Sequence, residues 1–150
     1  MSDAVTAAEQ SGSIPKLPIV AAIVALVGLV DSVYLTVHHL TAAPVPCSII
    51  DGCETVLTSP YAEIAGIPLA AFGAVAYFAA FSLALLAAFG NRLMWTLFGA
   101  QVIVMAMFTA WLIYLQAVVI GAFCQFCLLS AATSLTLLVL FVVSIVIKRK

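Results

Sequence analysis

Four long apolar segments follow one another along this 150-residue chain, and polar or turn-forming residues separate them. They are residues 17–40, 68–89, 94–119 and 124–147. A helix needs about 20 apolar residues to cross the hydrocarbon core of a bilayer, and each segment is at least that long. A signal peptide is the alternative for the first segment, but its apolar region covers only about 7–15 residues. The pattern therefore predicts four membrane-spanning helices.

Residues 41–65 are the one long connection between these segments, and they are polar and rich in proline. Ser59 followed by Pro60 is typical of a helix start, and Gly66 two residues before Pro68 indicates a stop and a new start. We therefore expect a short helix between Ser59 and Gly66. Residues 1–16 are expected to form a flexible N-terminal tail, followed by a single membrane domain of residues 17–150.

The composition agrees with a membrane protein. Apolar residues make up 66% of the chain and charged residues 7%, against about 45–50% and 25% in soluble domains. We therefore expect the protein to be surrounded by membrane lipid. No basic run is dense enough to indicate binding to nucleic acid. We predict an all-α fold, an integral membrane four-helix bundle with a cysteine-bearing extracytoplasmic loop that contains the short helix.

The few charged residues predict the orientation. All five basic residues lie near the termini or in the turn between the second and third segments: Lys16, Arg92, Lys148, Arg149 and Lys150. Positively charged residues near the ends of membrane spans stay in the cytoplasm. We therefore expect an integral protein of the cytoplasmic (inner) membrane, with both termini cytoplasmic and the long loop on the extracytoplasmic side.

All four cysteines fall on that extracytoplasmic side, where disulfides form and persist. Cys47 and Cys53 lie in the long loop, and Cys124 and Cys127 open the fourth segment. The free N–H groups and the dipole of a helix N-terminus favour a thiolate, and a Cys-x-x-Cys motif lowers a thiol pKa from about 8.5 to about 3.5–7.5. Two pairs on one side allow electrons to pass by thiol–disulfide exchange.

Other interpretations of these residues remain open. The four cysteines can form two static disulfides or a zinc site, although the spacing of Cys47 and Cys53 is unusual for zinc, and we predict no metal. Asp31, a carboxylate within the first span, is either hydrogen-bonded inside the bundle or handles protons. His39 lies at the extracytoplasmic end of that span. It is either a solvent-exposed residue at the membrane interface without a role in the chemistry, or a source of protons.

Several motifs together resemble bacterial members of the vitamin K epoxide reductase family. The resemblance covers residues 19–147 and rests on Tyr34-Leu35-Thr36 with His39, the run from Cys47 to Ser59, Gly66-Ile67-Pro68-Leu69, Phe72-Gly73, and the run from Ile120 to Cys127. Its most specific part is the order of the loop cysteines, the serine six residues after the second of them, and the Cys-x-x-Cys that opens the last span.

The resemblance implies a four-helix bundle around a quinone, either menaquinone or ubiquinone. Electrons would come from a separate, secreted thioredoxin-like disulfide-carrier protein. By position, Cys47 would exchange with this partner, Cys53 would attack Cys124, and Cys127 would face the quinone. Ser59 would lie near the polar edge of the quinone. The implied activity is that of a quinone-dependent thiol–disulfide oxidoreductase that generates disulfides.

Phe126 is a second candidate for quinone contact, because it is adjacent to Cys127 in the sequence. Animal members of the family have an asparagine and a tyrosine that contact the vitamin K head group, at positions that align with Leu69 and Ala131 here. This difference favours quinone reduction over epoxide reduction. The alternatives are a vitamin K epoxide or quinone reductase of the same fold, and a non-enzymatic four-span protein with structural disulfides.

Overall fold

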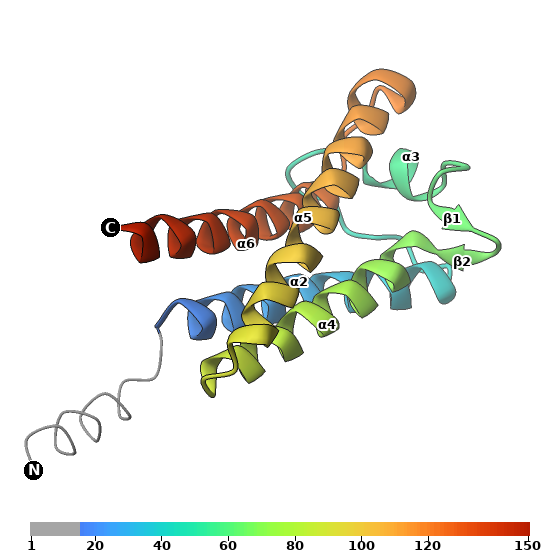
Figure 1. Cartoon of the computed structure of the whole chain (residues 1–150). Coiled ribbons are helices and arrows are strands. Elements are labelled where there is room, and N and C mark those ends of the chain that lie inside the picture. The colour runs from blue at the N-terminus through green and yellow to red at the C-terminus, as the bar shows by residue number, and fades with distance from the viewer. Residues whose placement is uncertain (1–15) are drawn as a thin grey trace, which may run out of the picture.

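The computed structural model describes residues 16–150, and four long helices dominate it (Figure 1). The elements in chain order are α2 (Lys16–Leu40), α3 (Cys53–Leu57), β1 (Glu63–Ile64), β2 (Ile67–Pro68), α4 (Leu69–Ala88), α5 (Arg92–Tyr114), the π-helix η1 (Leu115–Ile120) and α6 (Gln125–Arg149). The predicted flexible tail lies outside the described residues, except for Lys16, which begins α2.

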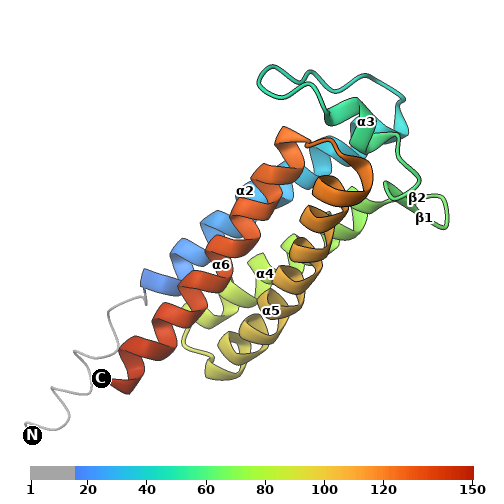
Figure 2. The same cartoon turned by 90° about the horizontal axis from the view of Figure 1, so that it is seen from above.

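The predicted four-helix fold is confirmed. Helices α2, α4 and α6, and α5 together with η1, are each long and apolar enough to cross a membrane. Such a set of apolar helices indicates an integral membrane protein. Helix α2 packs against α4 and α6, and α5 packs against the same two helices, so the four form a closed bundle (Figure 2).

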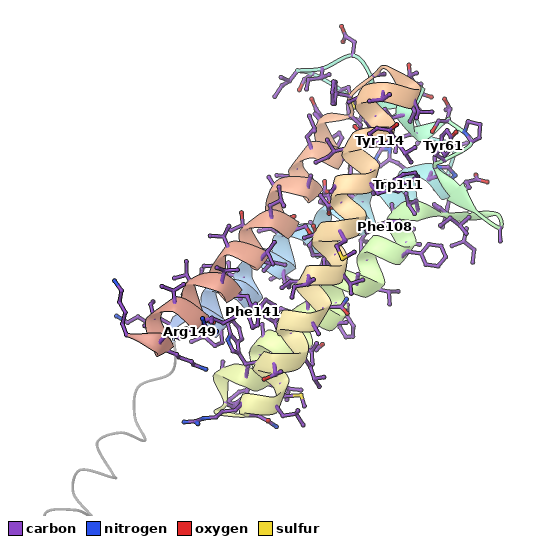
Figure 3. All side chains as sticks on the ribbon, turned by 45° about the horizontal axis from the view of Figure 1, so that its top comes forward. Tyr61, Phe108, Trp111, Tyr114, Phe141 and Arg149 are labelled. Atoms are coloured by element: carbon purple, nitrogen blue, oxygen red, sulfur yellow. A yellow bond between two sulfur atoms is a disulfide. The ribbon has the colours of Figure 1, made fainter. Side chains whose placement is uncertain are left out.

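The two ends of the bundle differ. Helix α3, the hairpin of β1 and β2, and the connection from η1 to α6 gather at one end, which therefore holds all four cysteines (Figures 1 and 2). The start of α2, the turn between α4 and α5, and the C-terminus lie at the other end. This second end carries the basic residues, including Arg149 (Figure 3). We call the first the cysteine end and the second the basic end.

Small residues let the helices approach closely. Buried alanines form much of the contact between α2 and α4, at Ala21, Ala22, Ala25, Ala80, Ala84 and Ala87. Gly28 of α2 lies against the ring of Tyr77, and Gly99 of α5 lies against the ring of Phe141, so a Cβ atom at either glycine would overlap that ring. Close packing of this kind stabilises helix pairs in a bilayer, where the hydrophobic effect contributes little.

The predicted short helix between Ser59 and Gly66 is wrong. The short helix lies earlier, at α3, and the Ser59 hydroxyl donates a hydrogen bond back to the carbonyl oxygen of Val56 at 2.7 Å. Ser59 thus ends one helix instead of beginning another. The following residues form the antiparallel hairpin of β1 and β2, whose turn uses positive φ angles at Ala65 (53°) and Gly66 (79°).

We predict that Gly99→Ala destabilises the bundle, because the added methyl group must displace the ring of Phe141. Overpacking of this kind costs about 1–3 kcal/mol of the free energy of unfolding. Chemical unfolding in detergent micelles measures the loss. The double variant Gly99→Ala/Phe141→Leu should recover most of it, and a single variant as stable as the unmodified protein would contradict this packing.

Candidate functional site

The two cysteine pairs meet at the cysteine end of the bundle. Cys47 and Cys53 form a disulfide with their Cα atoms 6.2 Å apart, and Cys124 and Cys127 are unpaired. Cys53 and Cys124 are fully buried and form a cluster with the buried Val56, and the other two cysteines pack against this cluster. The fold therefore brings a residue of each pair into one buried site, although the pairs are more than 70 residues apart in the sequence.

Two features hold the loop against the start of α6. A Cβ atom at Gly52 would overlap the carbonyl oxygen of Phe123, so only glycine lets the two backbones lie this close. The backbone N–H of Ile49 donates to Oε1 of Gln125 at 3.0 Å. Cys53 lies directly after Gly52 as the first residue of α3, and these contacts fix its position next to Cys124.

Cys124 is the N-cap residue of α6, with an extended backbone, and its carbonyl oxygen accepts the first helical hydrogen bond, from the N–H of Leu128 at 2.9 Å. The Cys127 thiol donates a hydrogen bond to the Cys124 sulfur and lowers the pKa of Cys124 to about 7, with help from the N–H groups of Cys127 and Phe126. Burial and the carboxylate of Asp31 oppose this lowering. Cys124 is thus the readier of the two thiols to react as a thiolate.

Gln116 also positions Cys124, although it is not among the site residues predicted from the sequence. Its Oε1 accepts a hydrogen bond from the backbone N–H of Cys124 at 3.1 Å, and both residues are buried. Gln116 belongs to η1, and short π-helical segments are frequent at functional sites. The signal in the sequence was an amide side chain inside an apolar span, eight residues before Cys124.

A cavity of about 310 Å³ lies between the helices next to the cysteine cluster, and Cys127 is one of its lining residues. We call it the inner cavity. Its lining is mostly apolar and includes Tyr61 from the loop and Phe108 from α5 (Figure 3). The polar lining residues include His39, Ser59, Gln101, Gln116, Tyr77 and Ser130. A mostly apolar cavity with a few polar groups is typical of a site for a small organic molecule.

The structure separates the two candidates for quinone contact. Ser59 lines the inner cavity with Cys127, and so do Leu69 and Ala131. The ring of Phe126 instead packs in the cysteine cluster, with its centroid 5.4 Å from that of Tyr34 in α2. Within residues 16–150, Phe126 is not among the residues that line the inner cavity.

Asp31 is buried in α2, and its Oδ2 has no hydrogen-bond partner within the described residues 16–150. It does not line the inner cavity, whereas the adjacent Ser32 does. Over the same part of the chain, no group of three or more histidine, cysteine or carboxylate side chains is arranged to hold a metal ion.

We predict that the hydroxyl of a serine at position 127 can replace the thiol as the donor to Cys124. In Cys127→Ala this donor is lost, so the pKa of Cys124 should rise from about 7 toward the ordinary thiol value. With the loop disulfide intact, each variant has a single titratable thiol, and its thiolate absorbance near 240 nm can be followed against pH. Equal titration midpoints in Cys127→Ser and Cys127→Ala would contradict this assignment.

The sequence matches the model of one protein family, described as the vitamin K epoxide reductase family. The match covers residues 19–142, which includes the four apolar helices up to the last turns of α6 and all four cysteines. Members of this family are membrane oxidoreductases. Because the match covers far more than half of the chain, this protein belongs to the vitamin K epoxide reductase family.

Proposed function

We propose that this protein generates disulfides, by passing electrons from a separate thioredoxin-like protein through its two cysteine pairs to a quinone. The observation that carries this proposal is the position of Cys124, buried against Cys53 on one side and hydrogen-bonded to Cys127 on the other. Cys127 in turn lines the inner cavity. The contacts therefore support a continuous route from the loop to the cavity.

Cys47 and Cys53, which we call the loop pair, receive the electrons first. Cys47 is partly exposed and Cys53 is fully buried, so a thiolate of the partner protein reaches Cys47 more easily. Its attack forms a mixed disulfide with Cys47 and releases Cys53 as a thiolate. Cys53 then attacks the Cys124–Cys127 disulfide at Cys124, the cysteine against which it is packed, and Cys127 leaves as a thiolate. This thiolate takes up one of the protons released by the partner's thiols, so that Cys127 faces the cavity as a thiol.

Completion of the exchange restores the loop disulfide. The second thiol of the partner releases Cys47, and the Cys47 thiolate attacks Cys53, which frees Cys124. One disulfide has then formed in the partner. Cys124 and Cys127, which we call the inner pair, are both reduced and hold the two electrons. This intermediate of the proposed cycle has the same cysteine pairing as the structure, in which Cys47 is bonded to Cys53 while Cys124 and Cys127 are unpaired.

The inner cavity is suited to a quinone head group. Its volume of about 310 Å³ and its apolar walls fit a flat ring, and Gln116 and Ser59 supply polar groups. The Ser59 hydroxyl can donate to a quinone oxygen when it turns from the carbonyl oxygen of Val56. When bound, a quinone of the menaquinone or ubiquinone type accepts two electrons and two protons.

The cavity favours a quinone over an epoxide. Opening an epoxide requires directed protonation, and the positions that align with the asparagine and tyrosine of animal members carry the apolar side chains of Leu69 and Ala131. We propose that the cysteine end faces the extracytoplasmic side of the cytoplasmic membrane, because the basic residues lie at the opposite end. That side is also where a secreted partner is available.

We expect Cys127→Ser to accumulate a disulfide between Cys53 and Cys124, because the Cys124 thiolate can attack the loop disulfide at Cys53 and release Cys47, but no thiol at position 127 remains to displace Cys53 from Cys124. Mass spectrometry of unreduced peptides would detect this bond. Both Cys124→Ser and Cys127→Ser should lose quinol formation with a reduced thioredoxin-like donor. Unchanged turnover in either variant would overturn the proposed route.

The loop pair and the inner pair can be tested separately. The double variant Cys47→Ser/Cys53→Ser should lose oxidation of the protein donor, since no loop thiol can exchange with it. The variant should still reduce quinone when dithiothreitol, which is small enough to reach the inner pair directly, is the donor. Parallel quinol assays with the two donors make this comparison, and equal loss with both would argue against separate roles.

A further inference from the structure

A second cavity, of about 480 Å³, lies at the cysteine end beside the inner cavity, and we call it the outer cavity. Its lining is more polar and includes His38, Glu54, Thr58 and Glu63. Within residues 16–150, only four residues line both cavities, and two of them are polar: His39 and Ser59. These two side chains therefore stand between a polar compartment and the apolar one.

His39 is held in place by a carboxylate. Its Nε2 lies 2.6 Å from Oε1 of Glu63, which joins the last turn of α2 to the β1 strand. Because the hydrogen bond at one ring nitrogen fixes the role of the other, the contact with Glu63 leaves Nδ1 free to exchange protons. The His39 side chain is only 22% exposed, so its ring is largely enclosed.

The proposed reaction needs a proton from outside the cysteine pair. Oxidation of two thiols releases two electrons and two protons, and reduction of a quinone takes up two of each. When Cys124 reacts as a thiolate, its proton has already left, and only the proton of the Cys127 thiol remains. One further proton must therefore enter the inner cavity from elsewhere.

Within residues 16–150, His39 is the only histidine, carboxylate or basic residue among those that line the inner cavity. The remaining polar lining groups are hydroxyls, amides and the Cys127 thiol, and imidazole is the side chain that exchanges protons most readily near neutral pH. The charged or titratable groups around His39 are Glu63 on β1, Glu54 on α3 and His38 on α2, with Tyr61 on the side of the inner cavity.

We propose that His39 carries protons from the outer cavity to the quinone bound in the inner cavity. This inference rests on the proposed function. His39 Nδ1 gives its proton to one quinone oxygen and takes another from water in the outer cavity, while Glu63 holds the ring. The Cys127 thiol proton goes to the other oxygen, and the electron pair comes from the two sulfurs as the Cys124–Cys127 disulfide forms.

The first test compares His39→Gln with His38→Gln, using dithiothreitol as donor and decylubiquinone or menadione as acceptor. Glutamine keeps a hydrogen bond to Glu63 but cannot transfer a proton, so His39→Gln should lower kcat by about 100-fold, within the range of general acid catalysis. His38 lines only the outer cavity and contacts the carbonyl oxygen of Ala43, so His38→Gln should keep the activity of the unmodified protein.

The pH profile distinguishes proton transfer from a structural role. The dependence of activity on pH should differ in shape between the unmodified protein and His39→Gln, because only the unmodified protein has a proton-transferring side chain at this position. Added imidazole should restore part of the rate in His39→Ala. A loss that is the same at every pH and is not rescued by imidazole would overturn the proposal.

A footprinting experiment needs no turnover. Diethyl pyrocarbonate modifies accessible imidazoles, and mass spectrometry locates the modification. A quinone in the inner cavity should protect His39 and leave His38 reactive, whereas equal protection of both or of neither would place the quinone away from His39.

The two proposals can fail separately. Should the unmodified protein not reduce either quinone, the proposed function itself fails. Should the unmodified protein be active and His39→Gln match it in rate and pH profile, only the role of His39 is overturned.

Discussion

The burial of Cys53 against Cys124 is the contact on which the cysteine end of this protein depends. A disulfide exchange requires two sulfurs to approach each other, and in this chain one sulfur belongs to the short helix α3 of the loop and the other to the start of α6. The close approach of Gly52 to the backbone of Phe123, and the hydrogen bond from Ile49 to Gln125, bring them together. Helix α3 is only five residues long, which suits a segment whose task is to place one cysteine.

The same site also needs polar groups in an otherwise apolar bundle. The bilayer offers no hydrogen-bond partners, so irregular backbone must be satisfied by the protein itself. The π-helix η1 and the left-handed Gly121 end the third span and turn the chain, and Gln116 accepts the N–H that the start of α6 leaves free. Small residues allow the helices to pack closely, at Gly28 in the middle of α2 and at Gly99 nearer the basic end. Close helix packing thus supports the inner cavity and the cysteines Cys124 and Cys127.

Hydropathy and charge were sufficient to predict the four helices, because a bilayer imposes length and composition on every span. The site was predicted only in part. A serine such as Ser59 occurs both at helix starts and at helix ends, so the sequence alone does not decide between them. The hydrogen bond from its hydroxyl to Val56 shows that Ser59 follows the end of α3. Phe126 is adjacent to Cys127, yet neighbouring residues on a helix point about 100° apart, so its ring packs toward Tyr34 while Cys127 lines the cavity.

A single anaerobic turnover tests most directly whether Cys124 and Cys127 pass their electrons to a quinone. Protein with the loop disulfide intact and with Cys124 and Cys127 reduced is mixed with one equivalent of quinone, while quinol and protein thiols are followed together. We predict one quinol for each Cys124–Cys127 disulfide formed, with the disulfide between Cys47 and Cys53 unchanged. Quinol that appears without loss of these two thiols, or thiols that persist in the presence of quinone, would contradict it.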